Sequence, residues 1–334
     1  MNLQTRIQLL AKLGVYMLST DAHWSAAKEQ ASRENGWFIP EFVDRAVQSI
    51  AESYLDNNVL TNWASTYQIP VDNPHPKTIG IVMAGNIPLV GFHDFLCVFI
   101  TGHIAVIKPS SKDDTLIRHL AAKLCEWLPG ADHFIRFATM LKGCDAYIAT
   151  GSNNSSGYFE YYFSKYPNII RRNKTSVAVL TGEETPGELA SLADDVYLYF
   201  GLGCRNVTKL YVPAGYDFVP LLNAFKRYDY LADHHKYKNN YDYNLAILLL
   251  NHEFYMSNPS ILLAEKEALF SPISQLNYAY YENRPSLLKE LKNHPDLQAL
   301  VGKDLIPFGK SQFPAISDYA DNVDTLNFIL NLKN

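Results

Sequence analysis

Residues 77–111 read KTIGIVMAGNIPLVGFHDFLCVFITGHIAVIKPSS. Two short apolar runs, Thr78–Ala84 and His103–Ile107, flank a longer run, Pro88–Thr101, that has a proline at its start. Short apolar runs bounded by turn residues predict buried strands, and a proline in the first turn is typical of a helix. Strand, helix and strand at this spacing indicate a parallel βαβ unit and hence a doubly wound α/β sheet.

The same alternation continues toward the C-terminus. Residues 3–68, by contrast, carry apolar positions at helical spacing, and the segment VDNPHP (71–76) ends that pattern. The fold class we predict is therefore α/β, with a helical N-terminal region and two doubly wound domains with parallel sheets. Further expected strands are Ala146–Ala149, Ser176–Leu180 and Val207–Val212, and further expected helices are Asp113–Leu128, Gly157–Tyr166 and Glu188–Phe200.

The composition is that of an ordinary globular protein, with 48% apolar residues, 19% charged residues and a formal net charge of −5. The sequence has no lysine- or arginine-rich stripe that would indicate nucleic-acid binding. No apolar run approaches the roughly 20 residues that span a bilayer. The first residues lack the apolar run of a signal peptide. The 22 tyrosines, many of them between 227 and 283, are expected to be packing and surface aromatics. The scattered cysteines indicate reduced thiols in the cytoplasm: Cys97, Cys125, Cys144 and Cys204.

Three turns follow expected strands, at the edge where open α/β sheets bind ligands. In MAGNIP (83–88) the glycine permits a tight turn and the Asn86 amide can donate from a fixed position, although a plain β–α turn has the same letters. In AVIKPSS (105–111) Lys108 can reach a ribose or phosphate, although strand-end lysines are often only solvated. In IATGSNNSSG (148–157) small residues let a helix N-terminus approach a pyrophosphate, although serine-rich loops are common.

A fourth segment, FGLGCRN (200–206), contains a cysteine preceded by two glycines. Arg205 and a nearby helix end can lower the pKa of the Cys204 thiol toward the thiolate. A free cysteine is also often a small buried hydrophobe, so this segment alone leaves both interpretations open.

The order of the four segments is more specific than any one of them. Gly-Asn-x-Pro after a strand, then Lys-Pro-Ser, Thr-Gly-Ser and Gly-x-Cys, resembles the aldehyde dehydrogenase superfamily. Within it the chain looks most similar to acyl-CoA reductases related to the fatty-acid reductase of bioluminescence, and FGLGCRNVTK (200–209) is the most specific fragment. The resemblance spans roughly residues 78–212, and PFG (307–309) and DYADNVD (318–324) look like the family's C-terminal segment.

The resemblance implies a covalent mechanism. Cys204 would attack the acyl carbonyl, while the Asn86 amide and the Cys204 backbone N–H stabilise the oxyanion, at about 3–4 kcal/mol per donor. The acyl thioester would then accept hydride and collapse to aldehyde. Lys108 and Ser110 would hold the adenosine ribose of the cofactor. Residues implied to face the nicotinamide and phosphates are Thr150, Gly151 and Ser152.

Two departures from the oxidising members indicate direction and cofactor. Those members carry a glutamate in Glu-Leu-Gly-Gly-Lys, the base for a hydrolytic water, whereas the corresponding segment here, IRRNK (170–174), has no carboxylate. The resemblance therefore implies an NAD(P)H-dependent acyl-CoA reductase that forms aldehyde. NAD-preferring members place a glutamate three residues after the strand-end lysine, where this chain has Ser111. Serine can donate to a 2′-phosphate, so we expect NADPH, with NADH as the alternative.

The strand–helix pattern places the crossing into a second α/β domain at Lys174–Ser176, and together with the resemblance it divides the chain. Residues 1–173 would form the helical N-terminus with a Rossmann-like cofactor-binding domain, and 174–305 the catalytic domain with the nucleophile. Residues 306–334 would return to the cofactor domain or to an oligomer interface. The expected partners are a small-molecule acyl thioester, further copies of the chain, and a protein that donates the acyl group or consumes the aldehyde. The acyl chain length stays open.

Three other interpretations compete with this one. An acyl-phosphate, semialdehyde-forming reductase would need a basic pocket, which Arg171, Arg172 and Lys174 could supply. A catalytically inactive binding member of the same fold would have no need of both Asn86 and Cys204. A metal hydrolase built on Asp233-His234-His235 is disfavoured because adjacent histidines on a helix point apart.

Overall fold

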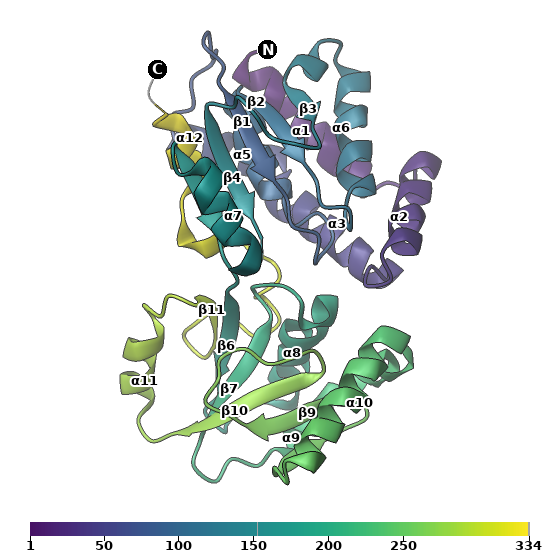
Figure 1. Ribbon diagram of the computed structural model, residues 1–334, viewed down its shortest axis with the longest axis vertical. Helices are drawn as coiled ribbons and strands as arrows, with labels where there is room; N and C mark the ends of the chain where they lie inside the picture. The colour runs from purple at the N-terminus through teal and green to yellow at the C-terminus, as the bar shows by residue number, and fades with distance from the viewer. Residues whose placement is uncertain (152, 333–334) are drawn as a thin grey trace. The chain divides into compact units, whose positions relative to one another are not determined.

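The computed structural model describes residues 1–151 and 153–332, with the side chains of 153–155 left out. The chain forms two compact units, which are described separately (Figure 1). The first comprises Met1–Asn173 and the residues from Pro314 onward, and the second is Lys174–Phe313. Each contains a mainly parallel sheet with helices, which confirms the predicted α/β fold class. Residues 306–313, expected in the C-terminal segment, lie in the second unit.

The first unit opens with helices α1 (Leu3–Met17), α2 (Ala22–Glu34), α3 (Pro40–Tyr54) and α4 (Asn57–Thr66), as the apolar spacing predicted. The guanidinium of Arg6 is fully buried and donates to the carbonyl oxygens of Met1 at 2.7 Å and Ile100 at 2.8 Å. These bonds fasten α1 to the end of α5 (Phe92–Ile100). The apolar face of α1 packs into the main core through Ile7, Leu10, Leu13 and Met17.

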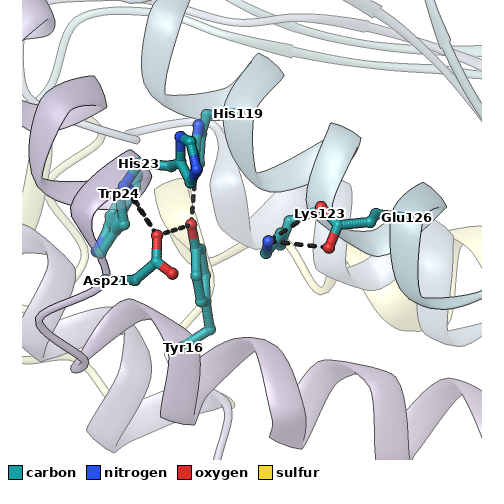
Figure 2. A network of polar contacts seen from close by, with 7 residues as sticks. All are labelled: Tyr16, Asp21, His23, Trp24, His119, Lys123 and Glu126. Atoms are coloured by element: carbon teal, nitrogen blue, oxygen red, sulfur yellow. Dashed lines mark hydrogen bonds and ion pairs between the residues drawn. The ribbon is translucent and has the colours of Figure 1, made fainter.

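A polar cluster joins α1, α2 and α6 (Thr115–Trp127) (Figure 2). The Tyr16 hydroxyl donates to Asp21 at 3.2 Å and lies 2.8 Å from Nε2 of His119. The His119 ring stacks against the rings of Tyr16 and Trp24. Asp21 also caps α2 by accepting the backbone N–H of Trp24 at 3.1 Å. Burial raises the pKa of Tyr16 to about 12, so the phenol stays protonated and the cluster fastens three helices.

The sheet of the first unit has the order β3-β2-β1-β4-β5, and all its strands are parallel. On one face, the ring of Phe163 from α7 (Asn153–Phe163) stacks on Tyr147 at 4.2 Å. The other face packs against α5, α6 and the N-terminal helices through a continuous apolar core. The strands are β1 (Thr78–Val82), β2 (Ile104–Lys108), β3 (Ile135–Phe137), β4 (Ala146–Thr150) and β5 (Asn168–Arg171).

The C-terminal segment packs against the helices of the first unit. Tyr67 donates to Asp324 at 2.6 Å, and the Trp63 indole donates to the Tyr319 hydroxyl at 3.1 Å. Asp324 caps α12 (Thr325–Leu330) by accepting the backbone N–H of Asn327. Residues 314–332 are therefore part of this unit's fold.

The sheet of the second unit has the order β11-β6-β7-β10-β9-β8, and only β8 runs antiparallel. Figure 1 shows α11 (Arg284–Leu291) on one face and α8 (Pro186–Tyr197), α9 (Val219–Phe225) and α10 (His235–Leu250) on the other. The strands are β6 (Thr175–Val179), β7 (Val207–Pro213), β8 (Tyr255–Ser257), β9 (Leu262–Glu265), β10 (Gln275–Tyr281) and β11 (Leu297–Gly302).

The tyrosine-rich part of the second unit contributes to both core and surface. Tyr197 stacks on Tyr228 with ring centroids 4.7 Å apart, and its hydroxyl lies 2.8 Å from the Ser260 hydroxyl. Tyr237 is buried, while Tyr243 on the same helix is 66% exposed. The buried tyrosines thus supply apolar area and also satisfy polar groups within the core.

Candidate functional site

The strand order of the first unit reverses direction at β1. The chain moves from β1 through β2 to β3 on one side and through β4 to β5 on the other. Loops at such a switch point leave on opposite sides of the sheet and open a crevice at the carboxyl ends. Asn86, which is exposed, follows β1, and Thr150 is the last residue of β4. Both predicted residues therefore lie at the carboxyl edge, where open α/β sheets commonly bind ligands.

The turns after β1 and β2 touch at a glycine. A Cβ placed on Gly85 would lie 2.6 Å from Oγ of Ser110 and 3.1 Å from Cβ of Lys112. Only a residue without a side chain lets the two turns approach this closely. The Met83 N–H also donates to the Lys108 carbonyl at 3.0 Å. The segments MAGNIP and AVIKPSS, singled out separately from the sequence, are thus neighbours in space.

A buried carboxylate, not predicted from the sequence, connects the same two turns. Oδ2 of Asp113 accepts the backbone N–H of Leu89 at 2.6 Å, and the Asp113 N–H donates to the Ser110 carbonyl at 3.0 Å. Burial raises the pKa of Asp113 to about 7. Leu89 has a φ of +56°, so the helix expected from Pro88 begins only at Phe92.

The predicted cofactor residues belong to this edge of the first unit. Lys108, Ser110, Thr150 and Gly151 are half-buried and Ser111 is exposed. Oγ of Ser110 accepts the Lys112 N–H at 3.2 Å, so this hydroxyl also shapes its own turn. Ser152, the remaining predicted cofactor residue, lies outside the described residues.

The acyl-phosphate alternative needs a basic pocket, but Arg171 is buried and does not contribute charge to an exposed one. It is 3% exposed, forms an ion pair with Asp94 of α5, and donates to the Thr325 hydroxyl at 2.7 Å. Its guanidinium is also 3.5 Å from the Thr150 hydroxyl. Arg172, the next residue, is exposed and paired with Glu160. Sequence could not distinguish the two arginines, because Asp94 is remote in the chain.

Cys204 lies in the second unit, in a turn just before β7, and is half-buried. The Asn206 N–H donates to the Gly203 carbonyl at 3.1 Å, and the Gly203 N–H donates to the Asn206 side chain at 2.8 Å. Oγ of Ser176, on the neighbouring strand β6, donates to the Cys204 carbonyl at 3.1 Å. The backbone around the thiol is therefore held by Ser176 and by Asn206.

A left-handed hook precedes the cysteine turn. Tyr199, Phe200 and Gly201 have φ values of +56°, +58° and +74°. The helix expected to continue to Phe200 therefore ends at Tyr197. Left-handed backbone costs about 1–2 kcal/mol for each non-glycine residue, so surrounding contacts must hold it. The Tyr199 and Phe200 side chains are both buried in the second unit's core.

The other three cysteines are poor nucleophile candidates. Burial raises the pKa of the thiols of Cys97, Cys125 and Cys144, which keeps them protonated at neutral pH. Cys97 and Cys144 are also almost inaccessible, at 0% and 3% exposure. Cys204 is half-buried, and the backbone of its turn is held by the hydrogen bonds described above.

The remaining candidates do not form a recognisable site. Nδ1 of His234 accepts the backbone N–H of Tyr237 at the start of α10. Across the described residues, no group of three or more His, Cys, Asp or Glu side chains could hold a metal ion. The same residues include no helix long and apolar enough to cross a membrane. A pocket of about 480 Å³ lies in the second unit between the first turn of α8 and residues 302–308. Because β6, β7 and β11 are parallel, that pocket lies at the sheet edge opposite Cys204.

Comparison with known proteins identifies the fold. No protein-family model matches the chain, and no curated protein sequence matches it. Among solved structures, aldehyde dehydrogenase 21 from Physcomitrella patens, in complex with succinate, aligns with a TM-score of 0.67 at 13% identity, over 91% of this chain and 74% of that chain. A lactaldehyde dehydrogenase aligns with a TM-score of 0.65 at 13% identity, over 90% and 74%. A Mycobacterium tuberculosis aldehyde dehydrogenase complexed with NAD⁺ aligns with a TM-score of 0.65 at 12% identity, over 90% and 73%. The chain thus has the fold of aldehyde dehydrogenases.

Proposed function

We propose that this protein reduces an acyl thioester, such as an acyl-CoA, to an aldehyde with NADPH, using Cys204 as covalent nucleophile. One observation carries the proposal. Within an aldehyde dehydrogenase fold, the half-buried Cys204 lies in a turn held by hydrogen bonds from Ser176 and Asn206, and burial raises the pKa of the other three thiols. A nucleophile needs access and a fixed orientation together, and the half-buried position and hydrogen-bonded backbone of Cys204 support that role.

The cofactor would bind at the carboxyl edge of the first unit's sheet. Binding of the cofactor there is supported by the close approach of Gly85 to Ser110, which brings the turns that carry Asn86 and Lys108 together. Lys108, Ser110 and Ser111 would contact the adenosine ribose and its 2′-phosphate, and Thr150 and Gly151 the nicotinamide side. The reduced nicotinamide supplies a hydride to the acyl carbon.

The protein's own residues would carry the rest of the reaction. The Cys204 thiolate attacks the thioester carbon, and the bond from that carbon to the leaving thiol breaks, so acyl-Cys204 forms and the thiol departs. As the family resemblance implies, the Asn86 amide and the Cys204 N–H would stabilise the oxyanion. After hydride addition the bond from carbon to Sγ breaks, which releases aldehyde and regenerates the thiolate. Overall, acyl thioester, NADPH and a proton give aldehyde, thiol and NADP⁺.

The reductive direction is supported by residues 170–174, which offer no carboxylate to activate a hydrolytic water. The acyl-phosphate alternative is weakened because Arg171 is buried against Asp94. Its remaining support is the exposed Arg172 and the half-buried Lys174.

The test combines turnover with site identification. Purified protein is mixed with acyl-CoAs of several chain lengths and NADPH, and loss of reduced-nicotinamide absorbance is followed. Without NADPH, mass spectrometry should find the acyl group on Cys204. Cys204→Ala should abolish reduction, whereas Cys125→Ala, the matched control at another partly accessible cysteine, should retain most of it. Acylation at another cysteine, or none with any thioester, would refute the proposal.

A further inference from the structure

Every polar atom of the Asn206 side chain is engaged around the cysteine turn. Asn206 is 0% exposed, and its Oδ1 accepts the Gly203 N–H at 2.8 Å. Its amide nitrogen has two N–H groups and lies within hydrogen-bond distance of three carbonyl oxygens. These belong to Leu198 at 2.9 Å, Asp195 at 3.1 Å and Val196 at 3.3 Å.

These bonds join two segments that the left-handed hook separates. The Asp195 and Val196 carbonyls lie in the last turn of α8, where helical partners run out. Gly203 lies beyond the hook, next to Cys204. The amide nitrogen of Asn206 therefore donates to carbonyl oxygens at the end of α8, and its Oδ1 holds the cysteine turn by accepting the Gly203 N–H. Alanine can do neither, and a carboxylate would place negative charge against three carbonyl oxygens.

We propose that Asn206 is the positioning residue for Cys204. Asn206 accepts the Gly203 N–H with its side chain and donates its own backbone N–H to the Gly203 carbonyl. These two bonds fix the direction of the backbone N–H and the thiol of Cys204. Asn206 touches no reacting atom, so its effect on catalysis runs entirely through Cys204. This inference rests on the proposed nucleophilic role of Cys204.

The first experiment compares two reactions of the same thiol. Acylation of Cys204 by acyl-CoA depends on the angle of attack and on oxyanion donors, whereas alkylation by iodoacetamide depends mainly on access and ionisation. In Asn206→Ala, single-turnover acylation should fall by about tenfold or more, while alkylation changes by less than about threefold. The KM for acyl-CoA should stay within about twofold, because orientation acts in the transition state.

The matched control is Asn277→Ala. Asn277 is also buried in the second unit, and its amide also donates to two backbone carbonyls, those of Ala268 at 3.0 Å and Phe270 at 3.1 Å. Both variants should lose stability, but the ratio of acylation to alkylation should fall only in Asn206→Ala. An unchanged ratio, or an equal fall in the control, would overturn the inference.

A second variant, Asn206→Asp, keeps the shape and adds a pH readout. The protonated acid can accept from Gly203 and donate to one carbonyl, whereas the ionised form loses every donor. Relative to wild type, its acylation rate should therefore rise as pH falls from about 8 to about 5.5. No pH-dependent recovery would count against the inference. If wild-type Cys204 is not acylated at all, the proposed function fails as well; normal wild-type acylation with unaffected variants refutes only the role of Asn206.

Discussion

The carboxylate of Asp113 accepts the Leu89 N–H at 2.6 Å and so joins the turn that follows Asn86 to the turn that follows Lys108. Leu89 holds a left-handed conformation there, with φ of +56°. Left-handed backbone costs about 1–2 kcal/mol for a leucine, which this short hydrogen bond helps to offset. The other carboxylate oxygen, Oδ1, is buried without a hydrogen-bond partner among the described residues. A protonated Asp113 would avoid burying charge at that oxygen.

The first prediction concerns the pH dependence of stability. Burial raises the pKa of Asp113 to about 7, whereas an unfolded aspartate titrates near 3.9. The folded state therefore binds the proton more tightly, and this stabilisation, full below pH about 4, is lost as pH rises toward 7. Over that window the loss is about 3 kcal/mol. Asp113→Asn keeps an acceptor for Leu89 but cannot ionise, so its urea midpoint should fall less over the same window. Parallel pH profiles for the two proteins would contradict this.

The fold class could be predicted from local sequence patterns. Where the observed elements differ from the predicted ones, the reason includes contacts with residues distant in the sequence. The strands and helix within residues 77–111 were predicted because each is an apolar run bounded by turn residues. The helix start was placed at Pro88 instead of Phe92 because the left-handed Leu89 depends on Asp113, a partner outside the turn. Strand β5 was missed because Asn168–Arg171 is short and ends in an arginine. Local patterning cannot reveal that Arg171 is buried against Asp94.

The second prediction concerns that ion pair. Removing one member of a buried pair leaves an uncompensated charge and typically costs about 3–5 kcal/mol. We expect Arg171→Met to lower the free energy of unfolding by about that amount, because Asp94 would remain buried. The double variant Asp94→Leu, Arg171→Met should be more stable than the single variant. Arg172→Met is the control: its exposed pair with Glu160 should contribute about 0–1 kcal/mol. Equal losses for the two arginines, measured by urea denaturation, would contradict the burial argument.

The third prediction concerns Asn86, which stands exposed beyond β1. As an oxyanion donor it would act mainly in the transition state, so Asn86→Ala should lower kcat by about a hundredfold or more with little change in KM. Binding of NADPH, followed by its fluorescence, should be unaffected. A change confined to KM, or loss of folding, would identify the segment as a plain β–α turn.

The fourth prediction concerns reaction direction. With aldehyde and NADP⁺ but no coenzyme A, little free acid should form, because residues 170–174 contain no carboxylate to act as base. Added coenzyme A should restore oxidative turnover, with acyl-CoA as product. Chromatography of the products distinguishes the two. Efficient acid formation without coenzyme A would mean that another group activates water.

The sequence indicates the candidate residues of the site more fully than the hydrogen bonds that hold them in place. Cys204 and Asn86 were predicted as site residues because each lies in a short glycine-containing segment after or before an expected strand. Asn206 is only two positions from Cys204, yet its role depends on carbonyl oxygens at the end of α8, and these come near only through the left-handed hook. Aromatic residues such as Tyr199 and Phe200 give no sequence signal for that conformation.

The last prediction concerns the 2′-phosphate of the cofactor. Ser111 is exposed at the turn after β2, beside Ser110, whose hydroxyl accepts the Lys112 N–H. A serine can donate to a 2′-phosphate and nearby lysines add favourable charge, with about 1–3 kcal/mol for each charge-assisted contact. Ser111→Glu should therefore raise the KM for NADPH much more than that for NADH. Ser111→Gln, similar in size but uncharged, separates repulsion from bulk and should have a smaller effect. A wild-type protein selective for NADH, with Ser111→Glu neutral toward NADPH, would show that this turn does not contact the 2′ position.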